Sequence, residues 1–200
     1  MNSLKILILL LALTWPVFGA EAFDYDKIYK EATRYTVIVT IETEVSFGTQ
    51  TTDIKSRGIG TVVSPEGLVI FDGRPIDSED PFSAMAGMQI NAEPKRIEIK
   101  FFEGKILTAE FLGIDRYTKL GFCRIIHEGK EKFPYASFSD RKKFVIGEML
   151  SGYKLLPEHI SPPLAIDVGM VSAFIQEPEE FVLTLGFGEG ELAAVLYDSL

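Results

Sequence analysis

The pattern of apolar and polar residues predicts one short helix followed by many short strands. Tyr25, Ile28, Tyr29 and Ala32 recur at helical spacing within residues 24–33. From residue 35 the period changes to two, which predicts a strand over residues 35–44. Further strands are predicted at residues 61–63, 68–71, 96–102, 105–112, 119–126, 144–152, 166–175, 181–185 and 193–197.

Turn residues separate these strands. Pro65 and Gly67 stand at the second and fourth positions of a predicted β-turn over residues 64–67. Gly104 marks a tight turn between two strands, and the glycines in residues 57–60 predict a turn there as well. Many short strands at regular spacing are typical of an all-β barrel or sandwich.

Composition and charge narrow the class of protein. The 200 residues are 46% apolar and 24% charged, which is typical of one globular domain. The net charge of −9 repels nucleic acid and anionic lipid, so neither is expected as a partner.

The N-terminus has the pattern of an export signal. Lys5 precedes an apolar run at residues 6–13, and A-E-A at residues 20–22 fits a cleavage site. The apolar run is too short to span a bilayer comfortably. We therefore expect residues 1–22 to be a signal peptide and residues 23–200 to be a periplasmic or extracellular domain, with no membrane span after cleavage; an uncleaved N-terminal anchor is the alternative.

Cysteine and histidine usage predicts no metal, cofactor or internal disulfide. Cys123 is the sole cysteine, and its strand-like surroundings favour a buried, inert thiol over a reactive one. His127 and His159 lie far apart in the sequence, and neither has a second ligand at a useful spacing.

Several segments carry more specific information. Residues 58–70 read G-I-G-T-V-V-S-P-E-G-L-V-I, followed by F-E-G-K at 102–105, G-I-D-R-Y-T at 113–118, I-G-E at 146–148 and V-G-M-V-S-A at 168–173. In this order they resemble segments of the HtrA/Deg family of trypsin-like serine peptidases, whose first segment reads G-S-G-F-I-I-S-P-D-G-Y-I-L. The resemblance runs from residue 28 to residue 200. It implies a double six-stranded β-barrel with the active site in the cleft between the barrels.

The resemblance also locates the three catalytic positions. The family histidine ends T-N-x-H, and residues 71–74 read F-D-G-R, so Arg74 takes its place. The family aspartate lies in T-D-[LI]-A, and T-K-L-G at 118–121 gives that place to Lys119. The family serine lies in G-N-S-G-G-P-L, and G-E-L-A-A-V-L at 190–196 gives that place to Leu192.

These replacements remove the serine mechanism. That mechanism needs a hydroxyl nucleophile, an imidazole base and a carboxylate that orients the imidazole. Arginine cannot accept the proton, and leucine has no nucleophile. Loss of the serine or the histidine alone lowers turnover about 10⁶-fold in another serine protease. The resemblance therefore implies a chain without a catalytic triad. Two cations brought together by the fold would also need carboxylate partners, and the nearest by sequence are Asp72 and Glu191.

Two departures from the family pattern follow. The chain is longer than family members between the first two positions, at residues 77–92, where Phe82, Met85 and Met88 would share one face of a short helix. This face either binds a partner or simply covers the barrel. The chain also stops at Leu200, soon after the nucleophile position. It is therefore expected to be a fragment or to leave the second barrel incomplete.

The sequence thus predicts an all-β, trypsin-like double β-barrel with a short N-terminal helix. The function expected is that of an exported, non-catalytic pseudoprotease that binds a polypeptide or protein partner. Two alternatives stay open, namely an active serine endopeptidase of the HtrA type and an envelope scaffold subunit without a peptide groove.

Overall fold

The computed structural model of the chain describes residues 23–47, 50–77, 89–90, 94–115, 117–129, 132–138, 143–161, 163–175, 181–186 and 197–198. Its elements are α2 (Tyr25–Tyr35), β1 (Thr36–Phe47), β2 (Gln50–Val62), β3 (Leu68–Asp72), the 3₁₀ turn η1 (Arg74–Ile76), β4 (Gln89–Ile90), β5 (Arg96–Phe101), β6 (Ile106–Ile114), β7 (Leu120–Ile125), β8 (Met149–Leu155), β9 (Leu164–Ile175), β10 (Phe181–Leu185) and β11 (Tyr197–Asp198). The predicted signal peptide at residues 1–22 lies outside the described residues, as do Phe82, Met85, Met88, Glu191 and Leu192.

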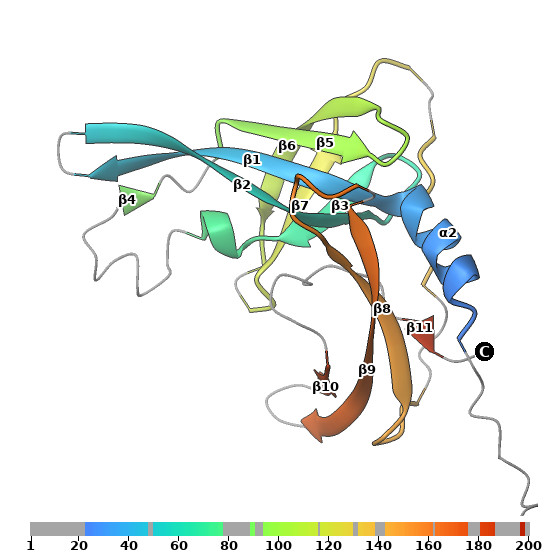
Figure 1. The fold of residues 1–200 in the computed structure, drawn as a ribbon. Coiled ribbons are helices and arrows are strands. Elements are labelled where there is room, and N and C mark those ends of the chain that lie inside the picture. Colours follow the sequence, from blue (N-terminus) through green and yellow to red (C-terminus); the bar gives the residue numbers. More distant parts are fainter. Residues whose placement is uncertain are drawn as a thin grey trace, which may run out of the picture.

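Six antiparallel strands form a closed barrel (Figure 1). Their order is β1–β2–β3–β7–β6–β5, and β5 pairs again with β1. Alternate residues along the barrel strands face inward, and those that are apolar form the core of the barrel. Val37, Val39 and Ile41 of β1, for example, are no more than 3% exposed.

The turn predicted at residues 57–60 is wrong, and Gly60 shows why. Residues 57–60 do not form a turn; they lie within β2 and pair with β1. A Cβ on Gly60 would stand 2.5 Å from a side-chain carbon of Val39 and 2.9 Å from one of Val69. The missing side chain of Gly60 therefore leaves room for Val39 and Val69 inside the barrel. Neither Gly58 nor Gly60 breaks the strand. The turn over residues 64–67 is confirmed, since Gly67 N–H donates to the Ser64 carbonyl at 3.1 Å.

A second, four-stranded antiparallel sheet has the order β10–β9–β8–β11. The fold is thus mostly β, with one closed barrel, a further sheet and a short N-terminal helix. In the described residues the second sheet does not close on itself. No helix in the described part of the chain is long and apolar enough to cross a membrane.

Helix α2 packs where the barrel meets the second sheet (Figure 1). Asp24 caps the helix by accepting a hydrogen bond from Lys27 N–H at 3.0 Å, which satisfies one free donor of the first turn. Ala32, on the buried face, packs with Ile59 of β2 and with Tyr153 and Leu164 of the second sheet. The helix thereby links elements from both ends of the sequence.

Candidate functional site

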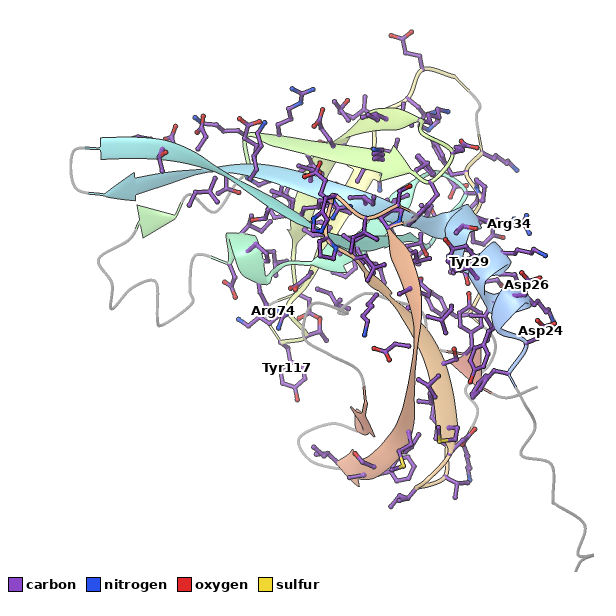
Figure 2. The ribbon with its side chains drawn as sticks, in the orientation of Figure 1. Asp24, Asp26, Tyr29, Arg34, Arg74 and Tyr117 are labelled. Atoms are coloured by element: carbon purple, nitrogen blue, oxygen red, sulfur yellow. The ribbon has the colours of Figure 1, made fainter. Side chains whose placement is uncertain are left out.

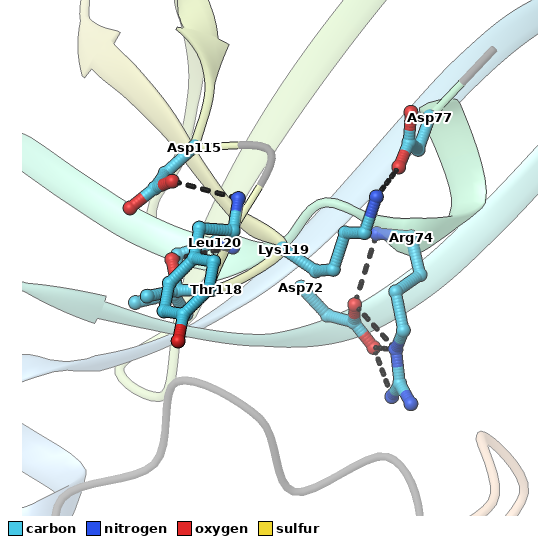
Figure 3. A network of polar contacts seen from close by, with 8 residues as sticks. Asp72, Arg74, Asp77, Asp115, Thr118, Lys119 and Leu120 are labelled. Atoms are coloured by element: carbon cyan, nitrogen blue, oxygen red, sulfur yellow. Dashed lines mark hydrogen bonds and ion pairs between the residues drawn. The ribbon is translucent and has the colours of Figure 1, made fainter. Parts of the chain in front are cut away.

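Arg74 and Lys119 lie next to each other at one end of the barrel, as predicted. Asp72 and Leu120 are opposite each other in the β3–β7 pairing. Gly73, which follows Asp72, therefore lies beside Lys119, which precedes Leu120. The Gly73 N–H donates to the Lys119 carbonyl at 2.9 Å. Figure 3 shows the resulting polar cluster, and Figure 2 shows Arg74 and Tyr117 at the same rim of the barrel.

Arg74 forms a fork-shaped ion pair with Asp72. The Nε atom of Arg74 donates to both carboxylate oxygens, at 2.9 and 3.0 Å, and a terminal nitrogen donates to Oδ2 at 2.5 Å. The main-chain N–H of Arg74 donates to the same carboxylate at 3.0 Å. Asp72 was one of the two partners predicted from the sequence, and this partner is confirmed. The arginine side chain stays 51% exposed, whereas that of Asp72 is 16% exposed.

Lys119 pairs with a different carboxylate. Its Nζ lies 2.5 Å from Oδ2 of Asp77, whose side chain is only 9% exposed. This pair was not predicted, because the two residues are far apart in the chain and Asp77 was assigned to the start of an insertion. Glu191, the other partner that the sequence predicted, lies outside the described residues.

Lys119 also has a strained main chain. Its φ of 61° is left-handed, a conformation that non-glycine residues seldom adopt. Two main-chain hydrogen bonds hold it, one from Lys119 N–H to the Asp115 carbonyl at 2.8 Å and one from Gly73 N–H to the Lys119 carbonyl. Such strain persists only where the surrounding contacts fix the residue.

Asp115 closes the turn that precedes Lys119. Its carboxylate accepts a hydrogen bond from Tyr117 N–H at 2.9 Å. This bond, followed by one from the Thr118 hydroxyl, lowers the pKa of Asp115 below its ordinary value. Asp115 is thus a turn carboxylate that holds the main chain ahead of Lys119.

Neither histidine belongs to the cluster. His127 follows the far end of β7, where its ring packs edge-on against Phe133 at 5.1 Å between ring centres. Six residues of β7 separate that end from the cluster, which is roughly 20 Å along an extended strand. His159 lies between β8 and β9. Within the described residues, no three His, Cys, Asp or Glu side chains gather in a way that would hold a metal ion.

The cluster borders the junction between the barrel and the second sheet. A small cavity of about 70 Å³ lies beside Asp72 and is lined by Arg57, Phe71 and Pro75 among others. Arg57 donates to the carbonyl of Leu156, just after β8, at 3.2 Å. The charged cluster therefore stands close to the contact between the two sheets.

Comparison with known proteins does not assign the chain to a family. No protein-family model matches the chain, and no curated protein is significantly similar to it.

Proposed function

We propose that this chain is a non-catalytic protein of the trypsin-like fold that acts outside the cytoplasm by binding a polypeptide. One observation carries the proposal. Arg74 and Lys119, to which the resemblance gives the places of the histidine and the aspartate, stand side by side, and each is neutralised by its own carboxylate.

The chemistry of this pair does not fit the serine mechanism. A guanidinium cannot act as a general base at any relevant pH. The Lys119 ammonium donates a hydrogen bond to the Asp77 carboxylate, and a cation cannot orient an imidazole as the family aspartate does. Under this proposal the two ion pairs stabilise the rim of the barrel, at the positions that the resemblance gives to the triad.

The arrangement of strands supports the fold part of the proposal. A closed six-stranded barrel is what the resemblance implies for the first barrel, and under this proposal the four-stranded sheet is part of the second. The contact of Arg57 with the Leu156 carbonyl joins the two halves close to the charged cluster.

Exposed apolar residues on the second sheet and in the turn before β8 support a polypeptide partner. Val145, Ile146, Met149 and Met170 are between 40% and 67% exposed. Met149 and Met170 stand opposite each other on β8 and β9. Val145 and Ile146 precede β8 in a turn fixed by the bond from Gly147 N–H to the Val171 carbonyl at 2.7 Å. Apolar surface of this kind, rich in adaptable methionine, suits a polypeptide ligand.

The experiment measures binding and hydrolysis of one substrate. Fluorescently labelled unfolded casein is mixed with the purified protein, and anisotropy reports binding while gel electrophoresis and a serine-reactive probe report catalysis. We expect binding without hydrolysis or labelling. Met170→Asp should weaken binding, whereas Ile106→Asp, at an apolar residue of the barrel that is also exposed (57%, against 40% for Met170), should not. Probe labelling of the protein, or no casein binding at all, would contradict the proposal.

A further inference from the structure

Strand β2 has one edge that is only partly paired. Strand β1 faces residues 50–61 of β2, whereas β3 faces only Gly60, Thr61 and Val62 on the other edge. Within the described residues, no strand and no other main-chain hydrogen bond reaches that second edge at Thr52–Ser56. Figure 1 shows this stretch in the long β1–β2 hairpin, which continues beyond the barrel.

The direction of the main-chain groups on this edge follows from the β2–β3 pairing. Val63 N–H donates to the Leu68 carbonyl at 2.8 Å, in continuation of the β2–β3 register. In an antiparallel pair only every second residue directs its N–H and C=O toward a given neighbour. The β1–β2 register runs without a shift, so odd-numbered residues of β2 point toward the β3 side. Asp53 and Lys55 therefore present their main-chain donors and acceptors at the free edge.

The sequence of this edge is complementary to itself. Two copies paired antiparallel about a two-fold axis at Ile54 place Ile54 opposite Ile54, and Asp53 opposite Lys55 on both sides. The outward-pointing residues then face one another, as the hydrogen-bond ladder requires. Axes at the neighbouring residues would instead place Asp53 opposite Asp53 or Lys55 opposite Lys55, and like charges directly opposite are destabilising. One register is thus favoured over its neighbours.

The local charges fit the same pairing. Lys95 is the shared partner of two carboxylates, Asp53 at 2.7 Å and Glu44 at 2.6 Å. This group of three carries one net negative charge, which Lys55 of a second copy would offset. Ile54, at the centre of the pairing, is 45% exposed.

We propose that the Thr52–Ser56 edge is the interface of a symmetric dimer and is filled by the same edge of a second copy of this chain. The proposal does not depend on the proposed polypeptide binding. Stable interfaces bury about 800 Å² on each partner, and five residues per chain make a smaller contact. The dimer is therefore weak and depends on protein concentration.

Disulfide trapping tests the register. Opposite residues in an antiparallel pair have Cα atoms about 4.5–5.5 Å apart, within the range that a disulfide spans. Ile54→Cys should therefore form a covalent dimer on oxidation. Thr52→Cys is the matched control, because the two copies of residue 52 would lie four residues apart along the strands, about 13 Å. Cys123 is buried and does not compete.

Charge reversal tests the pairing without a cross-link. Lys55→Asp should weaken dimerisation about tenfold or more in sedimentation experiments, because it sets Asp53 opposite an aspartate twice. Combining it with Asp53→Lys restores opposite charges and should restore the dimer, while thermal melting verifies that each variant is folded. The proposal is overturned if the wild-type protein stays monomeric at all concentrations, or if both cysteine variants cross-link equally well.

Discussion

The Nζ atom of Lys119 lies 2.5 Å from Oδ2 of Asp77, a carboxylate that the barrel leaves only 9% exposed. The lysine end of the pair is 41% exposed, so water screens part of the attraction. Removing the lysine nevertheless leaves the aspartate with its charge poorly solvated.

We therefore expect Lys119→Met to lower the free energy of unfolding by about 1–3 kcal/mol. Asp77→Asn should cost less, because its amide oxygen still accepts a hydrogen bond from the lysine. A double-mutant cycle of these two substitutions, measured by urea denaturation, gives the coupling between the residues. Additive effects would show that the ion pair contributes nothing to stability.

The left-handed main chain of Lys119 gives a separate prediction. Glycine adopts a φ of 61° without strain. Lys119→Gly and Lys119→Ala both remove the ion pair with Asp77, but only the glycine also removes the strain of the left-handed main chain. We expect the glycine variant to be more stable than the alanine variant, by about 1 kcal/mol. Equal or lower stability of the glycine variant in thermal melting would contradict this.

Gly60 and Gly58 form a matched pair on β2. A Cβ at Gly60 would collide with Val39 and Val69, whereas one at Gly58 would meet nothing within 4 Å. Gly60→Ala should destabilise the barrel by about 1–3 kcal/mol through overpacking. Gly58→Ala should be close to neutral. Chemical denaturation of both variants tests the close approach, and a tolerated Gly60→Ala would refute it.

Strands β1 and β2 show where prediction from the sequence succeeds and where it fails. Alternation of Val37, Val39 and Ile41 predicted β1 because one face of the strand is buried. The pattern Gly-Ile-Gly was read as a turn, since a glycine's role depends on which side chains approach it from other strands. The residues next to Gly60 in the sequence do not indicate which side chains of other strands lie close to it.

The charged cluster was likewise predicted only in part. Asp72 was found because it lies two residues from Arg74, within reach of a local contact. Asp77 was missed as the partner of Lys119, since that pair forms only when β3 and β7 lie side by side. The left-handed conformation of Lys119 also had no signal in its residue type.

Cys123 should be unreactive in the folded protein. The thiol is fully buried, and burial raises its pKa to about 12. Ellman's reagent should label it only after denaturation. Rapid labelling of the native protein at neutral pH would show that the thiol is accessible.

The same pKa shift predicts a loss of stability at alkaline pH. Above the ordinary thiol pKa of about 8.5, the unfolded chain loses this proton while the folded chain keeps it. The thiol therefore lowers the free energy of unfolding by about 1.4 kcal/mol for each pH unit between that value and the folded pKa. Cys123→Ala lacks this dependence. The stability difference between the wild type and this variant should shrink as the pH rises from 8 to 10.5, and a constant difference would contradict the shift.

Helix α2 also has a consequence for the order of folding. Ala32 packs against Tyr153 and Leu164, so helix α2 completes its contacts with residues that are synthesised long after it. Contacts between such distant residues require the closure of a long loop, which slows folding. The barrel strands, whose partners all precede residue 126, can pair before the second sheet is present. During synthesis, the apolar face of the helix therefore stays uncovered until the second sheet has been made, and apolar surface exposed in this way favours aggregation.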